Sequence, residues 1–205
     1  MTGRQVWQAM PQGWIEFVAQ GASAQDAWWE DYLRSGEGWL PDEVRDGLTA
    51  GYRAGCAFFR GRDFDFAGIA IALGETPFIT VMCTRVLRGA VADAASSAYG
   101  IHALLPALRF GEDAMTEPFL SEDGRTGTVT TATVTEGASD VIASIGEIRL
   151  PDEDGNVIVL GVCTDPAQRD FLALHTAFAL STTRLLPDGA YPTPAAGVVA
   201  AESSV

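Results

Sequence analysis

The sequence predicts an α+β protein built on one mainly antiparallel sheet with helices packed against it. Runs of apolar and β-forming residues follow one another across short turns, which is the pattern of an antiparallel sheet. Segments with helical spacing separate groups of such runs and do not alternate with each of them, so a parallel βαβ fold is not indicated. No linker-like stretch is visible within residues 1–186. We therefore expect a single domain over 1–186.

Length and composition agree with this class. The chain has 205 residues, 47% of them hydrophobic and 20% charged. These proportions are those of a globular protein with a sizeable core, and they exclude a disordered chain.

The N-terminal quarter predicts a strand and two helices. Residues 13–18 alternate in the manner of a short strand. Ser23 is a suitable N-cap for a helix that ends near Ser35. A second helix is expected after Pro41, ending near Gly55, because three large side chains recur every four residues. These side chains are Val44, Leu48 and Tyr52.

The central part predicts three strands and a helix. Residues 56–59, 66–73 and 78–87 are rich in apolar and β-forming types and are separated by turn residues, and we expect the last two to pair as an antiparallel hairpin. A helix is expected over about 91–105, where Pro106 would close it.

The C-terminal part predicts three more strands, over 126–135, 141–150 and 157–164. A last helix opens at Asp165-Pro166, since proline suits the first helical position. Its apolar face follows helical spacing and consists of Phe171, Leu174, Phe178 and Leu185. Residues 187–205 shift to Ala, Pro, Ser, Gly and Val, and we expect a flexible tail there.

The charge balance restricts the range of partners. Asp and Glu number 27 against 13 basic residues, which gives a formal net charge of −14, and every basic residue is arginine. The lack of lysine excludes Schiff-base and P-loop chemistry. An anionic surface repels nucleic acid and anionic lipid, so a charge-driven partner is expected to be a protein with a basic surface.

No residue pattern predicts catalysis, a metal site or a cofactor. Cys56, Cys83 and Cys163 lie far apart in apolar contexts and are expected to be buried, reduced thiols. His102 and His175 have no nucleophile or carboxylate placed near them by the sequence, so both are expected to be structural. We therefore expect a protein that is not an enzyme and has no catalytic, metal-binding or cofactor-binding residues.

The sequence shows neither an apolar leader segment nor an apolar run of 18 residues. A membrane span is therefore not expected, and the cytoplasm is the expected location.

Two segments resemble a known family. The opening Pro11-Gln12-Gly13-Trp14-Ile15-Glu16-Phe17 is similar to the P-x-G-W strand that begins many Mog1/PsbP-like chains, including actinobacterial proteins of the LpqN kind. The last third, with an Asp-Glu-Asp-Gly-Asn turn, a strand ending Gly-Val-Cys-Thr-Asp and a helix, resembles the closing unit of that α/β/α sandwich. The resemblance implies a non-enzymatic accessory protein that works through protein contacts, with a link to a secretion system as one such role.

An aromatic cluster is the expected partner-binding site. It consists of Trp28, Trp29, Tyr32 and Trp39. Consecutive tryptophans on a helix diverge by about 100°, so both cannot point into one narrow core face. Either one of them is part-exposed and anchors a partner, or both wedge between the helix and its neighbours.

Three functions follow as hypotheses. The first is a cytoplasmic adaptor or accessory protein that binds another protein. The second is an acidic immunity or inhibitor protein that neutralises a basic toxin, because opposite charge speeds capture. The third is a module that binds a small molecule in a pocket between sheet and helices.

Overall fold

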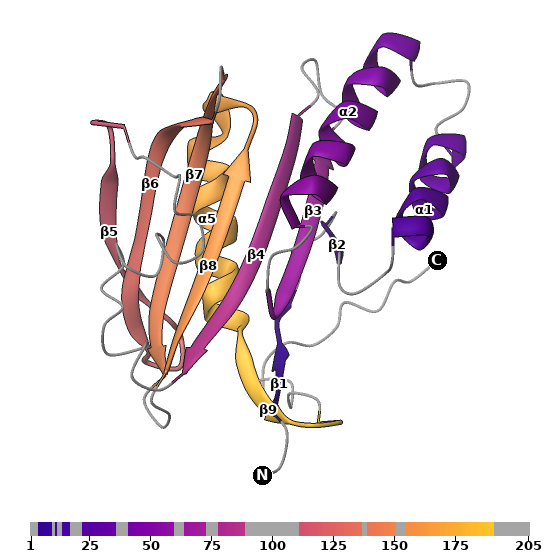
Figure 1. Ribbon diagram of the computed structural model, residues 1–205. Coiled ribbons are helices and arrows are strands. Elements are labelled where there is room, and N and C mark those ends of the chain that lie inside the picture. Colours follow the sequence, from indigo (N-terminus) through magenta and orange to yellow (C-terminus); the bar gives the residue numbers. More distant parts are fainter. Residues whose placement is uncertain are drawn as a thin grey trace, which may run out of the picture.

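A seven-stranded antiparallel sheet forms the middle layer of the molecule, with helices on both faces (Figure 1). The computed structural model describes residues 4–9, 11, 14–16, 22–35, 41–59, 64–72, 78–88, 111–136, 139–150 and 155–190. Strand order is β2-β3-β4-β8-β7-β6-β5, and each neighbouring pair is antiparallel. The predicted α+β class with a mainly antiparallel sheet is confirmed.

The strands of this sheet are, in chain order, β2 (Trp14–Glu16), β3 (Phe66–Ala72), β4 (Phe78–Arg88), β5 (Met115–Leu120), β6 (Thr126–Glu136), β7 (Ser139–Leu150) and β8 (Gly155–Cys163). A separate two-stranded ribbon joins β1 (Arg4–Trp7) to β9 (Arg184–Pro187). The helices are α1 (Ala22–Ser35), α2 (Asp42–Phe59), the short 3-10 helix η1 (Pro166–Gln168) and α5 (Arg169–Thr182).

Side-chain alternation along the central strands builds one core on each face. In β4, Val81 and Cys83 pack with α1 and α2, whereas Met82 and Val86 point to the α5 side. The same division holds in β8, where Ile158 lies on the α2 side. Because both faces are covered, these strands are apolar at nearly every position, as the sequence shows.

Helix α5 approaches the sheet closely at two glycines. A Cβ at Gly146 would lie 2.4 Å from Leu180 Cδ1, and one at Gly161 would lie 2.7 Å from Leu172 Cδ1. Larger residues at either position would force the helix away from β7 and β8.

Several expected elements differ in the structure. Residues 56–59 are the last turn of α2 and not a strand, because Cys56 continues the buried face of Leu48 and Tyr52. The last helix ends at Thr182, and Leu185 lies in β9, paired with Val6. Strands β1, β5 and β9 were not expected from the sequence.

Some expected elements cannot be compared. The helix over 91–105, with His102, lies outside the described residues. Of the predicted tail 187–205, residues 187–190 complete β9 and a turn, in which Gln5 Nε2 donates to the Ala190 carbonyl at 2.7 Å. Residues 191–205 lie outside the described ranges, and the boundary between domain and tail stays a prediction.

Arg125, directly before β6, joins the turn between β5 and β6 to the C-terminal end of α5. Its guanidinium donates to the carbonyls of Ser181 (2.8 Å) and Thr183 (3.0 Å) at the C-terminal end of α5, and to Asp123 at 2.8 and 3.0 Å. The Arg125 side chain is only 7% exposed. A cation at this position satisfies helix carbonyls that have no partner within α5.

Asp123 completes this network. Partial burial disfavours its charged form, but hydrogen bonds from Arg125 and Ser121 and the charges of Arg125 and Arg184 outweigh that effect and lower its pKa to about 2. Asp123 therefore stays ionised at neutral pH and holds both guanidinium groups, with Arg184 Nη2 at 3.0 Å.

We expect Arg125→Met to lower the free energy of unfolding by roughly 1–3 kcal/mol, because it removes buried charge-assisted hydrogen bonds. The Ser181 and Thr183 carbonyls keep Arg184 Nη1 as a donor, at 2.6 and 2.9 Å, so the loss is partial. Arg34→Met is the matched control. Arg34 pairs with Asp31 on the exposed side of α1, with both side chains about two-thirds exposed, and its loss should leave stability close to unchanged. Urea unfolding followed by circular dichroism measures both. Equal midpoints for the two variants would contradict the anchoring role of Arg125.

Candidate functional site

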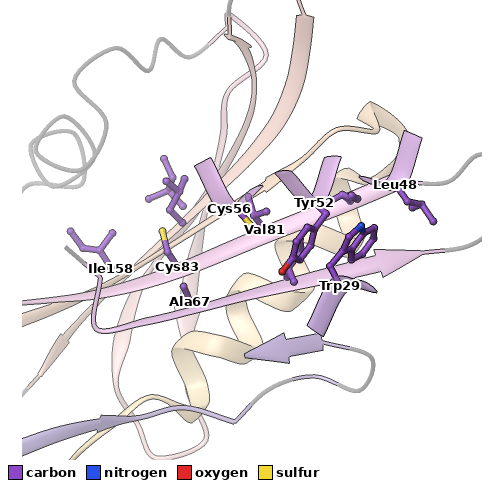
Figure 2. Packing of buried hydrophobic residues seen from close by; sticks show 12 residues of the cluster. Trp29, Leu48, Tyr52, Cys56, Ala67, Val81, Cys83 and Ile158 are labelled. Carbon is purple, nitrogen blue, oxygen red and sulfur yellow. The ribbon is translucent and has the colours of Figure 1, made fainter. Parts of the chain in front are cut away.

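Trp29 belongs to the core between α1, α2 and the sheet (Figure 2). Its ring stacks on Tyr52 with centroids 4.3 Å apart and planes 9° from parallel. The indole N–H donates to Thr49 Oγ1 at 3.2 Å, so the buried polar atom is satisfied. Only 5% of Trp29 is exposed. Its position is that of a residue holding α1 against α2.

Trp28 and Tyr32 lie at the edge of the same cluster. Both are half-buried, and their rings stack with centroids 5.5 Å apart. Desolvation raises the pKa of the Tyr32 hydroxyl. The two consecutive tryptophans thus divide as helical geometry requires, one in the core and one at its rim. Trp39 lies outside the described residues, and binding of a partner by this cluster stays a prediction.

We expect Trp29→Ala to destabilise the fold by about 3–5 kcal/mol, since it leaves a cavity beside Tyr52. Trp28→Ala should cost less than half as much, because that ring keeps part of its surface in water. Thermal unfolding of the two variants, each with the other tryptophan retained, compares them directly. A larger loss for Trp28 than for Trp29 would show that the core assignment is wrong.

An apolar groove lies beside this cluster, between α2 and the start of β4. It encloses about 360 Å³. Its lining is mostly aliphatic and aromatic, with one carboxylate and one hydroxyl, and consists of Glu43, Val44, Gly47, Leu48, Gly51, Phe78, Ile79 and Thr164. The groove has the size and character of a receptor for an apolar side chain.

Two glycines of α2 shape the groove. A Cβ at Gly51 would lie 2.3 Å from Ile79 Cδ1, so α2 touches β4 there. A Cβ at Gly47 would meet nothing within 4 Å, so one turn earlier the space is open. Helix α2 therefore contacts the sheet at Gly51 and leaves a hollow one turn earlier, at Gly47.

The rim of the groove is acidic. Glu43 lines it, and Asp42 and Asp46 are exposed on the same helix. Helix α1 also carries exposed carboxylates, those of Asp26, Glu30 and Asp31, but they do not line the groove. Arginines on these two helices are fewer, so the α1–α2 side of the molecule carries an excess of negative charge. An apolar hollow with an acidic rim suits an apolar side chain with basic neighbours.

A row of rings connects the groove to α5. Phe78 meets Phe171 edge-on with centroids 6.0 Å apart, and Phe171 meets His175 at 3.9 Å. Trp14 Nε1 donates to His175 Nδ1 at 3.2 Å, so this nitrogen acts as an acceptor and the imidazole is neutral. Desolvation lowers the pKa of His175. His175 thus holds β2 against α5.

Protonation of His175 should weaken the fold. Its pKa is lowered on folding, so the unfolded chain takes up the proton at a higher pH and stability falls as pH drops below about 6.5. We expect unfolding free energies measured from pH 7.5 to 5 to fall less steeply for His175→Gln, which keeps an acceptor but cannot titrate. The difference in slope between the two proteins reports His175 alone, since other groups titrate in both. Identical slopes would contradict the depressed pKa.

The other candidate residues have structural surroundings. Cys56, Cys83 and Cys163 are buried and form no disulfide, and burial raises the pKa of the Cys163 thiol. Within the part of the chain that the structure describes, no three His, Cys, Asp or Glu side chains lie close enough together to hold a metal ion. None of the helices in the described ranges is long and apolar enough to cross a membrane.

One half-buried carboxylate was not singled out from the sequence. Glu147 of β7 accepts a hydrogen bond from Asn156 Nδ2 at 2.7 Å, and burial raises the pKa of this carboxyl. The pair is formed across two strands, and neither residue has a local pattern that would reveal it.

The groove was also missed at the sequence level. Its walls come from α2, the first residues of β4 and Thr164 after β8, so no single segment carries its pattern. A readable signal is Gly51, a residue without a side chain on the helix face that also carries Leu48, because such a residue allows close approach of a helix to its neighbour.

Comparison with solved structures yields distant similarities. The chain resembles the crystal structure of LpqN, described as involved in cell envelope biogenesis of Mycobacterium tuberculosis, with a TM-score of 0.41 and 8% sequence identity over 91% of this chain and 86% of that one. No protein-family model matches the sequence, and no curated protein matches it. Similarity at this level does not establish a family or a function.

Proposed function

We propose that this protein is a non-enzymatic adaptor or accessory protein that binds another protein through the groove between α2 and β4. The observation that carries the proposal is an apolar hollow of about 360 Å³ with Glu43 at its rim. An apolar side chain of the partner fills the hollow, and a basic residue next to it pairs with the rim carboxylates. The half-buried Trp28 and Tyr32 lie in the same core cluster as Val44 and Leu48 of the groove.

The charge distribution supports a basic partner. The chain carries a formal charge of −14, and Asp42, Glu43 and Asp46 are exposed on α2, the helix that forms one wall of the groove. Such a surface attracts a cationic protein at long range and orients it before contact. The same charge favours the second candidate, an immunity or inhibitor protein that neutralises a basic toxin.

A small-molecule function has less support from the groove. Its volume falls within the range of ligand pockets, but Glu43 and Thr164 are the polar side chains in its lining. Small-molecule sites fix their ligand with several convergent polar groups. A side chain of a partner protein needs fewer polar groups inside the hollow, because contacts outside the hollow already orient it.

Membership in the Mog1/PsbP-like group, a cytoplasmic location and a link to a secretion system belong to the same proposal. The P-x-G-W segment at Pro11–Trp14 and the layout of the last third support the grouping. Helices on both faces of one sheet agree with the α/β/α layering that the grouping implies.

Filling the groove with a larger side chain, or reversing the charge at its rim, should abolish partner binding. Gly47→Phe places a ring in open space and keeps the fold, while Glu43→Arg reverses the rim charge. In quantitative pull-downs from cells that express the protein, we expect a specific partner to be at least about tenfold depleted with either variant, the equivalent of ~1.4 kcal/mol.

Two variants serve as matched controls. Ala50→Phe adds the same ring at an exposed position of α2 that does not line the groove, and Glu117→Arg makes the same charge change on β5, at the far edge of the sheet. Both should retain the partner. Recovery of the protein alone, or undiminished capture with both groove variants, would refute the proposal. A partner that is toxic when expressed alone and harmless when co-expressed would identify the immunity function.

A further inference from the structure

The groove between α2 and β4 is larger than one apolar side chain requires. It encloses about 360 Å³, whereas an apolar cavity of about 150 Å³ already holds a benzene ring. Its α2 wall extends from Glu43 to Gly51, a rise of about 12 Å along the helix axis. The groove therefore has room for two apolar side chains of a partner, placed one after the other along α2.

The strand that forms the sheet wall of the groove is paired on both sides. Strand β4 lies between β3 and β8. Where the groove reaches the end of β8, the Thr164 amide donates to the Ile79 carbonyl at 3.2 Å, and the Ile79 amide donates to Thr164 Oγ1 at 3.4 Å. A partner segment in extended conformation could not add to this strand, and its own amides and carbonyls would be buried without partners. A helix pairs these groups within itself, so a helix is the conformation that fits the groove.

The charge at the rim determines the flank of such a helix. Glu43 lines the groove, and Asp46 is exposed three residues further along α2, on the neighbouring turn of its surface. The two arginines of α2, Arg45 and Arg53, do not line the groove. Complementary charge at this rim is therefore positive, which requires Lys or Arg on the partner.

We propose that the groove receives a basic amphipathic helix of the partner protein, an inference that rests on the function proposed above. Two large apolar side chains of that helix, three or four residues apart, enter the groove over Gly47 and Leu48. This spacing places both side chains on one helix face about 5–6 Å apart, which fits the length of the groove. Lys or Arg on the flank of the same helix pairs with Glu43 and Asp46.

Selection from two libraries of displayed peptides tests the conformation and the charge of the occupant. The first library consists of alanine-based peptides of about 16 residues, long enough to form a helix, with randomised central positions. The second has the same length and carries proline at regular intervals, which keeps its members extended. Both are selected on the full chain and depleted on Gly47→Phe. We expect groove-dependent binders from the helical library alone, with two large apolar residues three or four apart and Lys or Arg within one turn.

Fluorescence anisotropy of a selected peptide then measures its Kd for each protein. Gly47→Phe and Glu43→Arg should weaken binding at least about tenfold. The matched controls Ala50→Phe and Glu117→Arg should bind as the wild type does. Proline placed between the two apolar residues of the peptide should also weaken binding at least about tenfold, because it breaks the helix. Added salt should weaken binding to the wild type, since it screens the pairing with the rim carboxylates.

Four results would each overturn the inference. They are groove-dependent binders from the extended library, binders without Lys or Arg, unchanged affinity after the proline substitution, and a helical library that yields no groove-dependent peptide. The proposed function is tested separately, by depletion of a cellular partner in pull-downs with the same groove variants. A captured partner that needs the groove but inserts an extended or uncharged segment would therefore overturn the helix and leave the proposed function standing.

Discussion

The cation of Arg125 is the contact on which the packing of the C-terminal half depends. Together with Arg184, it donates to the carbonyl of Ser181 in the last turn of α5 and to that of Thr183 directly after the helix, and it is itself paired with Asp123. The position of α5 on β7 and β8 is then fixed at one end by these hydrogen bonds and along its length by Gly146 and Gly161, where the sheet leaves no room for a side chain. Hydrophobic burial alone would tolerate sliding of the helix along the sheet, whereas a charged donor with fixed acceptors does not.

Charge and apolar surface are distributed differently on the two sides of the sheet. On the α1–α2 side, Glu43 lines an apolar hollow, and Asp42 and Asp46 are exposed on the same helix. On the α5 side, Leu174 and Phe178 are exposed without acidic neighbours in the following turns.

Local residue patterns predicted the helices and strands whose type depends on the spacing of apolar residues within one segment. The spacing of Val44, Leu48 and Tyr52 predicted a helix face, and all three pack in the core cluster. The apolar residues 56–59 were expected to form a strand, but a run of four apolar residues fits a strand and a helix equally well. Burial of Cys56 in the core between α2 and the sheet favours the helix. Strand β5 carries Pro118 and is exposed on both faces at most positions, so no alternation marks it. The groove required three separate segments to be placed in space, which no local pattern can do.

The pairing of β1 with β9 has a consequence for the order of events during synthesis. Gln5 pairs with Leu186 and donates its side-chain amide to the Ala190 carbonyl, a contact that spans 185 positions of the chain. At about 5–20 residues per second, the ribosome releases the second strand of this ribbon some tens of seconds after the first. The first strand must therefore wait, with its backbone hydrogen-bonding groups in water, until β9 (Arg184–Pro187) has emerged. Closing so long a loop is entropically costly, and we expect the ribbon to form among the last steps of folding.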